Sequence, residues 1–397
     1  MIHFNDAYDK VLEHTLDLGT EMVALNQGLG RILAETIYAD RDFPPFDRAA
    51  KDGIAIHSDA LKNGLDSFRI EGLASAGMPQ QKLKDVNNCI EIMTGAVVPR
   101  NADTVIMYEH LNIENGVATL LKQVKKGQEI HCKGSDLTSG AVLLPENTRI
   151  GAAEFGVLAS VGKSKIRVKK LPKVCVISTG NELVEVDQSP LPHQIRKSNV
   201  LSLYAALQKE KIEATSIHLK DEKADIKKEL IHILKTYDVL LLSGGVSKGK
   251  FDFIPEVLED LEVEKIFHRV AQKPGKPFWF GVQSALKTVV FSFPGNPVST
   301  FANYHIYFLP WLCRSLDVGI PQEEVLLDAS VAVKPPLTRF MQVKIENRKG
   351  NLWAIPVHEN GSGDLTSLVR SNGFVCLNPR GNAYEIGEVV PFIRTNP

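Results

Sequence analysis

Cysteine is scarce in this 397-residue chain: the five cysteines are widely spaced, and none forms a C-x-x-C pair. A disulfide framework or a structural zinc site needs paired or clustered cysteines, so neither is expected, and the pattern favours a reducing compartment. The first residues carry acidic side chains and lack the continuous apolar stretch of a secretory signal. We therefore expect a cytoplasmic protein.

An excess of charge of one sign is also missing, because 46 Lys and Arg oppose 47 Asp and Glu. Sequence-independent nucleic-acid binding needs a clustered basic excess, so no nucleic-acid partner is expected. No apolar run approaches the roughly 18 residues of a membrane helix, so no membrane partner is expected either. The 44% hydrophobic and 23% charged residues are typical of a globular protein.

Several common catalytic motifs are absent. The eleven histidines form no H-E-x-x-H pattern, and no G-x-S-x-G motif occurs, which disfavours a zinc protease and a serine hydrolase. The chain also lacks G-x-x-x-x-G-K-[ST] and a well-placed G-x-G-x-x-G. Neither a standard P-loop nor a Rossmann dinucleotide site is therefore indicated.

The patterns that are present change along the chain. Apolar spacing predicts helix from Phe4 to about Ala39, ending at the prolines of residues 42–47. Short alternating runs then predict strands, and from residue 171 strand and helix patterns alternate as in a parallel sheet. We expect a multidomain α/β plus β protein. Its parts are a bipartite helical domain (1–46 and 137–170), an inserted β domain (47–136), a central parallel-sheet α/β domain (171–321) and a small barrel-like C-terminal β domain (322–397).

Three glycine-containing loops follow predicted strands of the α/β domain. They span Ser178 to Glu182, Ser243 to Asp252, and Phe293 to Pro297. Ligands of open parallel sheets bind beyond the carboxyl ends of the strands, where glycine lets the backbone approach an anion. Each loop alone is also a common structural turn. Three such loops on one sheet edge predict an anion-binding site.

Charged residues lie in or near these loops. Lys273-Pro-Gly-Lys-Pro277 places two cations on a stiffened turn that suits a dianion, although the same pattern fits a solvated basic turn. Glu182, Asp221 and Asp252 are carboxylates beside the predicted anion site. Mg²⁺ shares oxygen ligands between carboxylates and phosphates, so a cation bridge is plausible chemistry here. For Asp221 a helix N-cap is the interpretation that the sequence alone favours.

Together the motifs resemble the molybdopterin molybdenumtransferases of molybdenum cofactor synthesis, whose animal relative is the C-terminal domain of gephyrin. The resemblance covers essentially the whole chain, with the motifs in the family's order. They are DFPPFDRAAKDGIA (42–55), IMTGA (92–96) with Pro99 and Ala102-Asp103, GSD (134–136), STGNEL (178–183), SGGVS (243–247) with Gly249 and Asp252, KPGKP (273–277) and PGNPV (294–298).

The resemblance implies an elongated homodimer of four-domain subunits, with each site shared between the α/β domain of one subunit and the β insert of its partner. The implied reaction inserts molybdate into adenylylated molybdopterin and hydrolyses the phosphoanhydride, which releases AMP, with Mg²⁺ or another divalent cation assisting. Further implied partners are the molybdopterin adenylyltransferase and the molybdoenzymes that receive the cofactor.

Residue roles are carried over by motif position. The catalytic candidates are Asp52, Thr94, Glu182, Asp252, Lys273 and Lys276. The substrate- and cofactor-binding candidates are Thr179, Gly180, Ser243, Gly244, Gly245, Ser247, Pro294, Gly295, Asn296 and Ser362. The metal-ligand candidates are Asp136, Asp221 and Asp252.

The chain departs from the family pattern at several positions: Ala49 and Lys51 replace a frequent Ser and Met, Asn181 a frequent Asp, His131-Cys132-Lys133 an Arg-rich stretch, and Gln342 an Arg. Lost charges that contact ligand directly would weaken metal or molybdate binding by roughly a few kcal/mol. Two alternatives therefore stay open, a molybdopterin adenylyltransferase and a non-catalytic molybdopterin-binding paralogue or scaffold. Molybdate and tungstate, both tetrahedral dianions, are not distinguished.

Overall fold

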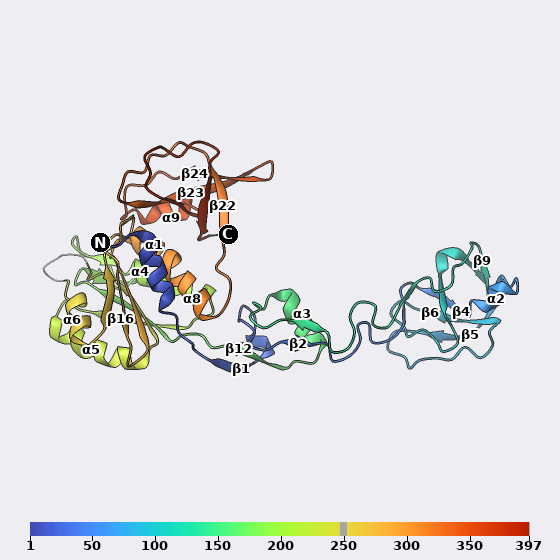
Figure 1. Ribbon diagram of the computed structural model, residues 1–397. Coiled ribbons are helices and arrows are strands. Elements are labelled where there is room, and N and C mark those ends of the chain that lie inside the picture. The colour runs from blue at the N-terminus through green and yellow to red at the C-terminus, as the bar shows by residue number, and fades with distance from the viewer. Residues whose placement is uncertain (247–251, 397) are drawn as a thin grey trace. The chain divides into compact units, whose positions relative to one another are not determined.

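The computed structural model describes residues 1–246 and 252–396, and its chain divides into two compact units (Figure 1). Unit 1 holds residues 1–34, 147–151 and 165–397, and unit 2 holds residues 35–146 and 152–164. Ser247, one of the predicted binding residues, lies outside the described residues.

A six-stranded sheet forms the centre of unit 1. Its strands, in spatial order, are β16 (Ala214–Leu219), β13 (Val174–Thr179), β17 (Val239–Ser243), β21 (Thr288–Phe293), β20 (Trp279–Gln283) and β18 (Glu264–His268). The first four are mutually parallel, as predicted. β20 is antiparallel to both neighbours, because only residues 284–287 join it to β21 and a parallel connection needs a long crossover.

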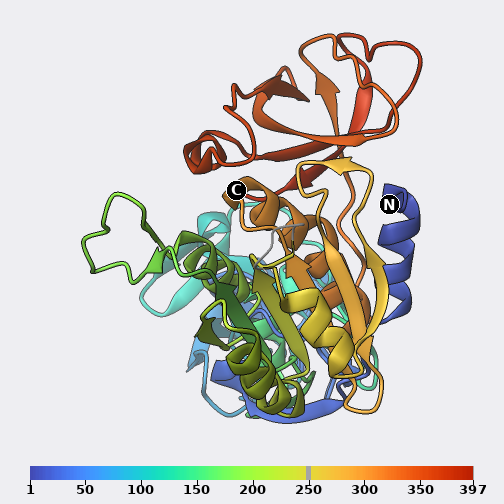
Figure 2. The ribbon, with the colours of Figure 1, turned by 90° about the vertical axis from the view of Figure 1, so that its left-hand side faces the viewer.

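Helices cover both faces of this sheet (Figure 2). Val174 and Val176 of β13 pack toward one face, and Cys175 and Ile177 toward the other, as the two-residue period of a strand dictates. The helices on the first face are α1 (Phe4–Glu13), α4 (Ser198–Lys209), α7 (Pro297–Asn303) and α8 (Leu309–Ser315). Those on the second are α5 (Lys223–Thr236) and α6 (Ile254–Asp260). Burying each large aliphatic side chain contributes about 1.5–3 kcal/mol.

The helix predicted from Phe4 to Ala39 forms only over α1. The segment after it is extended: β1 (Thr20–Ala24) pairs with β12 (Lys165–Lys169), and β2 (Ile37–Tyr38) pairs with β11 (Val142–Leu144). The second half of the helix prediction was wrong because its apolar residues are buried by pairing with chain more than 100 residues away. A local pattern does not show such partners.

Unit 2 contains a second six-stranded sheet. Its order is β7 (Thr104–Met107), β4 (Gly53–Ile56), β6 (Asn88–Ile92), β5 (Ser67–Ala74), β9 (Val117–Leu120) and β8 (Leu111–Glu114). β3 (Arg48–Ala49) pairs with β10 (Ile130–His131), and the helices are α2 (Asp59–Lys62) and α3 (Ala152–Ser160). The short runs that predict strands in the β insert include residues 89–93, 104–108 and 117–121, and the structure confirms these three strands to within one residue.

The C-terminal region forms a small barrel. The strands β23 (Thr338–Arg348), β24 (Asn351–Pro356), β22 (Glu323–Leu327), β26 (Val389–Arg394) and β25 (Gly373–Leu377) pair in that order, and β25 pairs back onto β23. β19 (Gln272–Lys273) adds to β23 at its outer edge, and α9 (Leu365–Arg370) begins at an N-cap whose Asp364 carboxylate accepts from Ser367 N. The predicted barrel-like domain is confirmed.

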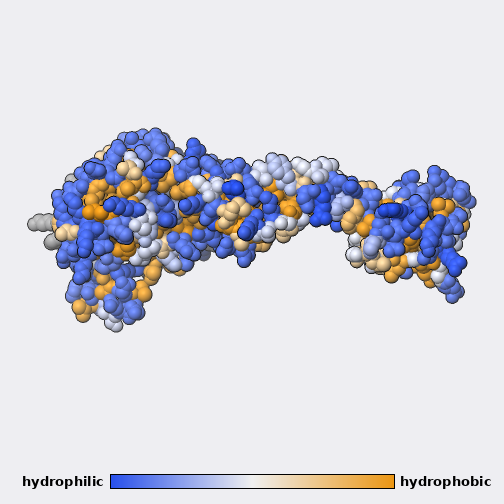
Figure 3. Space-filling view, turned by 90° about the horizontal axis from the view of Figure 1, so that it is seen from below, coloured by the Kyte–Doolittle hydropathy of each residue, from blue (hydrophilic) through white to orange (hydrophobic). Residues whose placement is uncertain are grey.

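Polar residues predominate on the face that Figure 3 shows, and apolar residues lie between them in small groups. Scattered exposed apolar residues of this kind are ordinary for a folded protein. Every helix within residues 1–246 and 252–396 is too short or too polar to serve as a membrane span.

Candidate functional site

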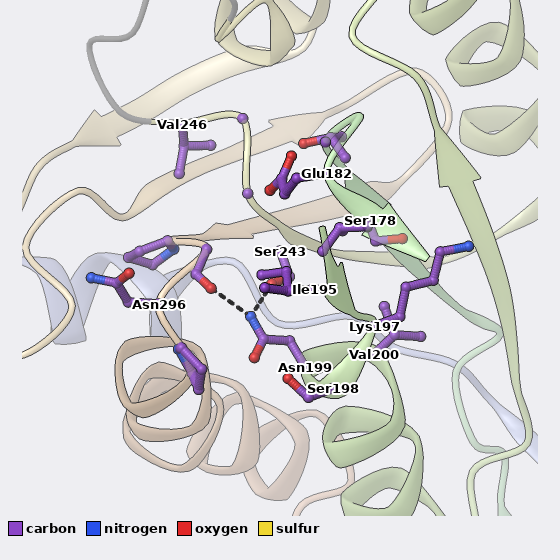
Figure 4. A pocket seen from close by; sticks show the side chains of 18 of the residues that line it. Ser178, Glu182, Ile195, Lys197, Ser198, Asn199, Val200, Ser243, Val246 and Asn296 are labelled. Atoms are coloured by element: carbon purple, nitrogen blue, oxygen red, sulfur yellow. Dashed lines mark hydrogen bonds between the residues drawn. The ribbon is translucent and has the colours of Figure 1, made fainter. Parts of the chain in front are cut away.

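A cavity of about 600 Å³ lies at the carboxyl ends of β13, β17 and β21 (Figure 4). The strand register explains its position, since Ser178 pairs with Ser243 and Ser243 with Phe293, so the three loops leave the sheet at the same level. The predicted convergence of the three loops on one edge is therefore confirmed.

Most of the predicted binding residues of the α/β domain line this cavity. They are Thr179, Gly180, Glu182, Asp221, Ser243, Gly244, Gly245, Asp252, Pro294, Gly295 and Asn296. Ser362 lies next to it: Asn296 Nδ2 donates to Ser362 Oγ at 2.8 Å, and Gly363 lines the wall. The C-terminal barrel region thus contributes one side of the cavity.

The two predicted lysines do not line the cavity. Lys273 and Lys276 are exposed on the turn that follows β18, and Pro277, the next residue after Lys276, is the part of this motif that reaches the cavity wall. The turn is fixed from inside by Gln272, whose amide nitrogen donates to Pro274 O and to Asn303 Oδ1, both at 2.9 Å. The two lysine side chains therefore project from a turn that the hydrogen bonds of Gln272 hold in place.

The glycine at the centre of the second loop is required by close packing. Gly245 has a φ of 71°, and a Cβ there would lie 2.7 Å from Ile254 Cγ1 and 2.9 Å from Thr179 Oγ1. No L side chain fits this position without displacing α6 or the first loop. The loop backbone is thereby held against the cavity. Gly244 N donates to Phe293 O at 3.1 Å, so the N–H of Gly245 is the glycine donor of this loop that could serve an anion.

The carboxylates of the cavity come from three different segments. Asp221 Oδ2 accepts a hydrogen bond from Asn181 N at 3.2 Å, and Asn181 Oδ1 accepts one from Asp221 N at 3.4 Å. The N-cap of α5 is Glu222, not Asp221, so the capping interpretation of Asp221 was wrong. Asp221 instead connects the loop after β16 to the first glycine loop, beside Glu182 and Asp252 on the same cavity wall.

No group of three or more His, Cys, Asp or Glu side chains within residues 1–246 and 252–396 is arranged to hold a metal ion by itself. Mg²⁺ rarely needs such a cage, because it keeps several waters and takes one or two carboxylates together with substrate phosphates. The carboxylates of Glu182, Asp221 and Asp252 supply oxygen ligands of the type that this binding mode uses.

Four consecutive polar residues that line the cavity were not predicted from the sequence: Arg196, Lys197, Ser198 and Asn199. Arg196 belongs to β15 (Ile195–Arg196), which pairs with β14 (Leu183–Val184), and Asn199 is the second residue of α4. The available signal was the Ser-Asn pair at the start of a predicted helix, which places polar side chains where the sheet strands end. The hydrogen bonds of Asn199 to both neighbouring loops are drawn in Figure 4.

A smaller cavity of about 230 Å³ shares Lys197 and Val200 with the first. Lys197 Nζ forms an ion pair with Glu185 that lowers the pKa of this carboxyl. His218 also lines this cavity, and its Nδ1 lies 2.9 Å from Ser178 Oγ. Partial burial, and then the charge of Lys197, lower the pKa of His218, so its ring is neutral near pH 7.

The predicted site residues of unit 2 form two separate pairs. Asp52 Oδ1 accepts from Thr94 N at 2.5 Å and from Thr94 Oγ1 at 2.7 Å, and these two bonds lower the pKa of Asp52. The next residue, Gly53, must be glycine because a Cβ there would lie 1.8 Å from Ile106 O on the paired strand. The Asp-Gly sequence is thus explained by the sheet, and the carboxylate stays ionised on the surface.

Asp136 belongs to the second pair. His131 Nε2 lies 2.8 Å from Asp136 Oδ1, and Arg48 Nη2 lies 3.1 Å from His131 Nδ1. Because a guanidinium only donates, His131 Nδ1 accepts from Arg48 and its Nε2–H donates to Asp136. His131, one of the departures from the family pattern, therefore holds the predicted metal ligand in place.

Another departure, Gln342, is buried in β23 away from the cavity lining. Its Nε2 donates to Glu359 Oε2 and to Ser367 Oγ, both at 2.8 Å. It thereby ties β23 to α9 and to residue 359, three residues before Ser362. Gln342 acts on the fold of this region and not on the cavity surface.

The fold and the cavity define a multidomain protein built around a molybdopterin-binding type of α/β domain. Residues 175–314 match the family described as a probable molybdopterin binding domain. Residues 2–162 match the MoeA N-terminal region (domain I and II), and residues 324–394 match the MoeA C-terminal region (domain IV).

The chain belongs to the molybdopterin molybdenumtransferase family, a family of enzymes. A molybdopterin molybdenumtransferase of Synechocystis sp. is 37% identical over 396 residues, 99% of each chain. One of Bacillus subtilis is 33% identical over 94% of this chain and 89% of its own. A crystal structure of a molybdopterin biosynthesis MoeA protein from a Pyrococcus species has a TM-score of 0.82 at 31% identity and covers 99% of both chains.

Proposed function

We propose that this protein inserts molybdate into adenylylated molybdopterin, with hydrolysis of the adenylate and release of AMP. The observation that carries the proposal is the cavity at the ends of β13, β17 and β21. It combines three glycine loops, which suit phosphates, with three carboxylates, which suit a divalent cation. The full-length similarity to molybdopterin molybdenumtransferases supports the same activity.

In this proposal the loop backbones at Gly245 and Gly295 bind the phosphate groups, beside Gly244, whose own N–H donates to Phe293 O. Asn296 with Ser362 borders the nucleotide end. Lys273 and Lys276, which project from the turn before Pro277, hold the molybdate dianion. A pair of unit charges 4 Å apart is worth about 4 kcal/mol at an effective dielectric near 20, before desolvation is subtracted, so two ammonium groups suit a dianion. Asp52 and Thr94 of unit 2 complete the catalytic set.

Mg²⁺ is part of the proposal, with Asp221, Asp252 and, from unit 2, Asp136 as the candidate ligands. When bound, the cation would neutralise charge on the phosphoanhydride and so favour departure of AMP. Asp221 is well suited to this role, because the Asn181 N–H bond fixes one carboxylate oxygen and leaves the other available.

The test is AMP release from adenylylated molybdopterin by the purified protein with Mg²⁺, measured with and without molybdate. We expect molybdate-dependent release, reduced about 100-fold in Asp252→Asn because a candidate metal ligand is lost. Asp260→Asn is the matched control: it removes the same charge from the end of α6, where Asp260 forms an ion pair with the surface residue Lys227 at 3.0 Å. AMP release that does not depend on molybdate would refute the proposed reaction. Equal activity in Asp252→Asn and Asp260→Asn would refute the role of Asp252 in it.

We further propose that the protein is a cytoplasmic homodimer whose sites are shared between its subunits. Its product would pass to molybdoenzymes. Mixing Asp52→Asn protein with Asp252→Asn protein tests the shared site. Each variant alone is expected to be about 100-fold less active than the wild type. The mixture is expected to recover activity, because mixed dimers contain one site with both residues intact. No recovery in mixtures shown to exchange subunits would mean that each subunit carries its own complete site.

A further inference from the structure

Asn199 makes a set of contacts that no other described residue of the cavity wall makes. Its Nδ2 lies 2.7 Å from Gly295 O, 2.9 Å from Ser243 Oγ and 3.4 Å from Thr300 Oγ1. Ser243 ends β17, and Gly295 belongs to the loop after β21. One side-chain amide at the start of α4 therefore joins two of the three glycine loops (Figure 4).

The orientation of this amide is forced by its partners. Gly295 O is a carbonyl oxygen and only accepts, so the nitrogen of Asn199 and not its oxygen must face it. The amide has two N–H groups, which match the two short contacts, to Gly295 O and to Ser243 Oγ. An acceptor at the same place would be repelled by the carbonyl.

Asn199 is half-buried and links the exposed backbone of Gly295 to two buried hydroxyl groups. Ser243 is 4% exposed and Thr300 is 2% exposed. Thr300 Oγ1 donates to Pro294 O at 2.5 Å, and the second loop is tied to the third by Gly244 N, which donates to Phe293 O at 3.1 Å. Linked hydrogen bonds reinforce one another, so we expect the position of the third loop relative to Ser243 to depend on the Asn199 donor that joins them.

We propose that Asn199 is a positioning residue, which holds the Gly244-Gly245 and Pro294-Gly295 backbones at the separation that binds the phosphate of a nucleoside monophosphate. The inference rests on the proposed function and adds a residue to it. Asn199 acts through the loops: its donor sets where the backbone N–H groups of both loops point. Loss of that donor moves the loops apart while the sheet, whose core lies below, stays folded.

The test is calorimetric titration of AMP into the full-length protein with Mg²⁺. We expect AMP affinity to fall about tenfold in Asn199→Ala, the loss of roughly one hydrogen bond of 1.4 kcal/mol. Asn199→Asp is expected to lose more, about 30-fold or greater, because a carboxylate meets the Gly295 carbonyl and the AMP phosphate. The control Gln208→Glu adds the same charge to the exposed end of α4 and is expected to bind AMP like the wild type.

A merely structural role predicts a different result. It would lower the fraction of binding-competent protein, seen as reduced stoichiometry, and leave the affinity of the remainder unchanged. In turnover, positioning predicts a raised KM for the adenylylated substrate at an unchanged concentration of active sites.

Equal AMP affinity in wild type and Asn199→Asp overturns the inference alone, as does lost stoichiometry with unchanged affinity. If Asn199→Asp does not fold, Asn199→Ala decides in the same way. Failure of the wild type to bind AMP overturns the inference together with the proposed function.

Discussion

The cavity of unit 1 and the polar pairs of unit 2 are built in different ways. In unit 1, parallel strands in register bring three backbone loops to one level, so the topology itself gathers the residues. In unit 2, Asp52 bonds to Thr94 and Asp136 to His131, as two separate side-chain pairs. The comparison teaches that unit 1 is equipped to bind an anion through its backbone, whereas unit 2 offers individual charged side chains.

The first prediction separates the two regions by the step they affect. Asp52→Asn is expected to lower the rate constant for AMP release about 100-fold, as loss of a positioned catalytic carboxylate does, and to leave AMP affinity unchanged. Rate measurements at saturating substrate and AMP titration check both halves. A large drop in AMP affinity would show that unit 2 contributes to nucleotide binding and would break the comparison.

Gly245→Ala tests the backbone character of the unit 1 cavity. The new methyl meets Ile254 and Thr179 at under 3 Å, so we expect AMP affinity to fall at least about tenfold and the free energy of unfolding to fall by about 1–3 kcal/mol. Gly350→Ala is the control, because it has a φ of 90° but no heavy atom within 4 Å of the added Cβ. Urea denaturation is expected to show that the control lowers the free energy of unfolding by only about 1 kcal/mol.

The sequence predicts the local elements of the cavity better than the contacts between distant segments. The bounds of α4 and β16 follow from local periodicity, and the glycine loops follow from strand ends, so the anion cavity was predictable. The contacts of Asn199 could not be predicted, since its partners Ser243 and Gly295 lie 44 and 96 residues away in the sequence. The extended segment after α1 was missed for the same reason, because its partner strands follow the inserted domain.

A smaller effect is expected where the C-terminal barrel meets the cavity. Ser362→Ala removes the acceptor of the 2.8 Å bond from Asn296, so we expect AMP affinity to fall about threefold, less than one full hydrogen bond is worth. Competitive displacement of labelled AMP measures this. An effect as large as that of Gly245→Ala would mean that Ser362 itself contacts the nucleotide.

The smallest predicted effect concerns acid stability of unit 2. Partial burial raises the pKa of Asp103, but bonds from Ser58 N and Oγ and the ion pair with Lys126 outweigh it and lower the pKa to about 2. A carboxyl whose pKa is lowered by folding stabilises the folded state at pH values above its pKa in the unfolded chain, 3.8. This stabilisation is lost as the pH falls toward 2.

Since the Asp103 side chain is half-buried, with 25% of its surface exposed, and solvent still screens its ion pair with Lys126, we expect a loss of about 1 kcal/mol between pH 4 and pH 2. Hydrogen exchange of the amides near Ser58 and along β7 measures it locally. Protection that falls equally in wild type and Asp103→Asn over this range would exclude Asp103 as its source.

The most direct test of the account is a crystal structure of this protein with AMP and Mg²⁺. We predict the AMP phosphate between the Gly244-Gly245 and Pro294-Gly295 backbones, with the cation on Asp221 or Asp252. AMP bound elsewhere in the protein, with this cavity empty, would contradict the assignment of the three glycine loops to the substrate.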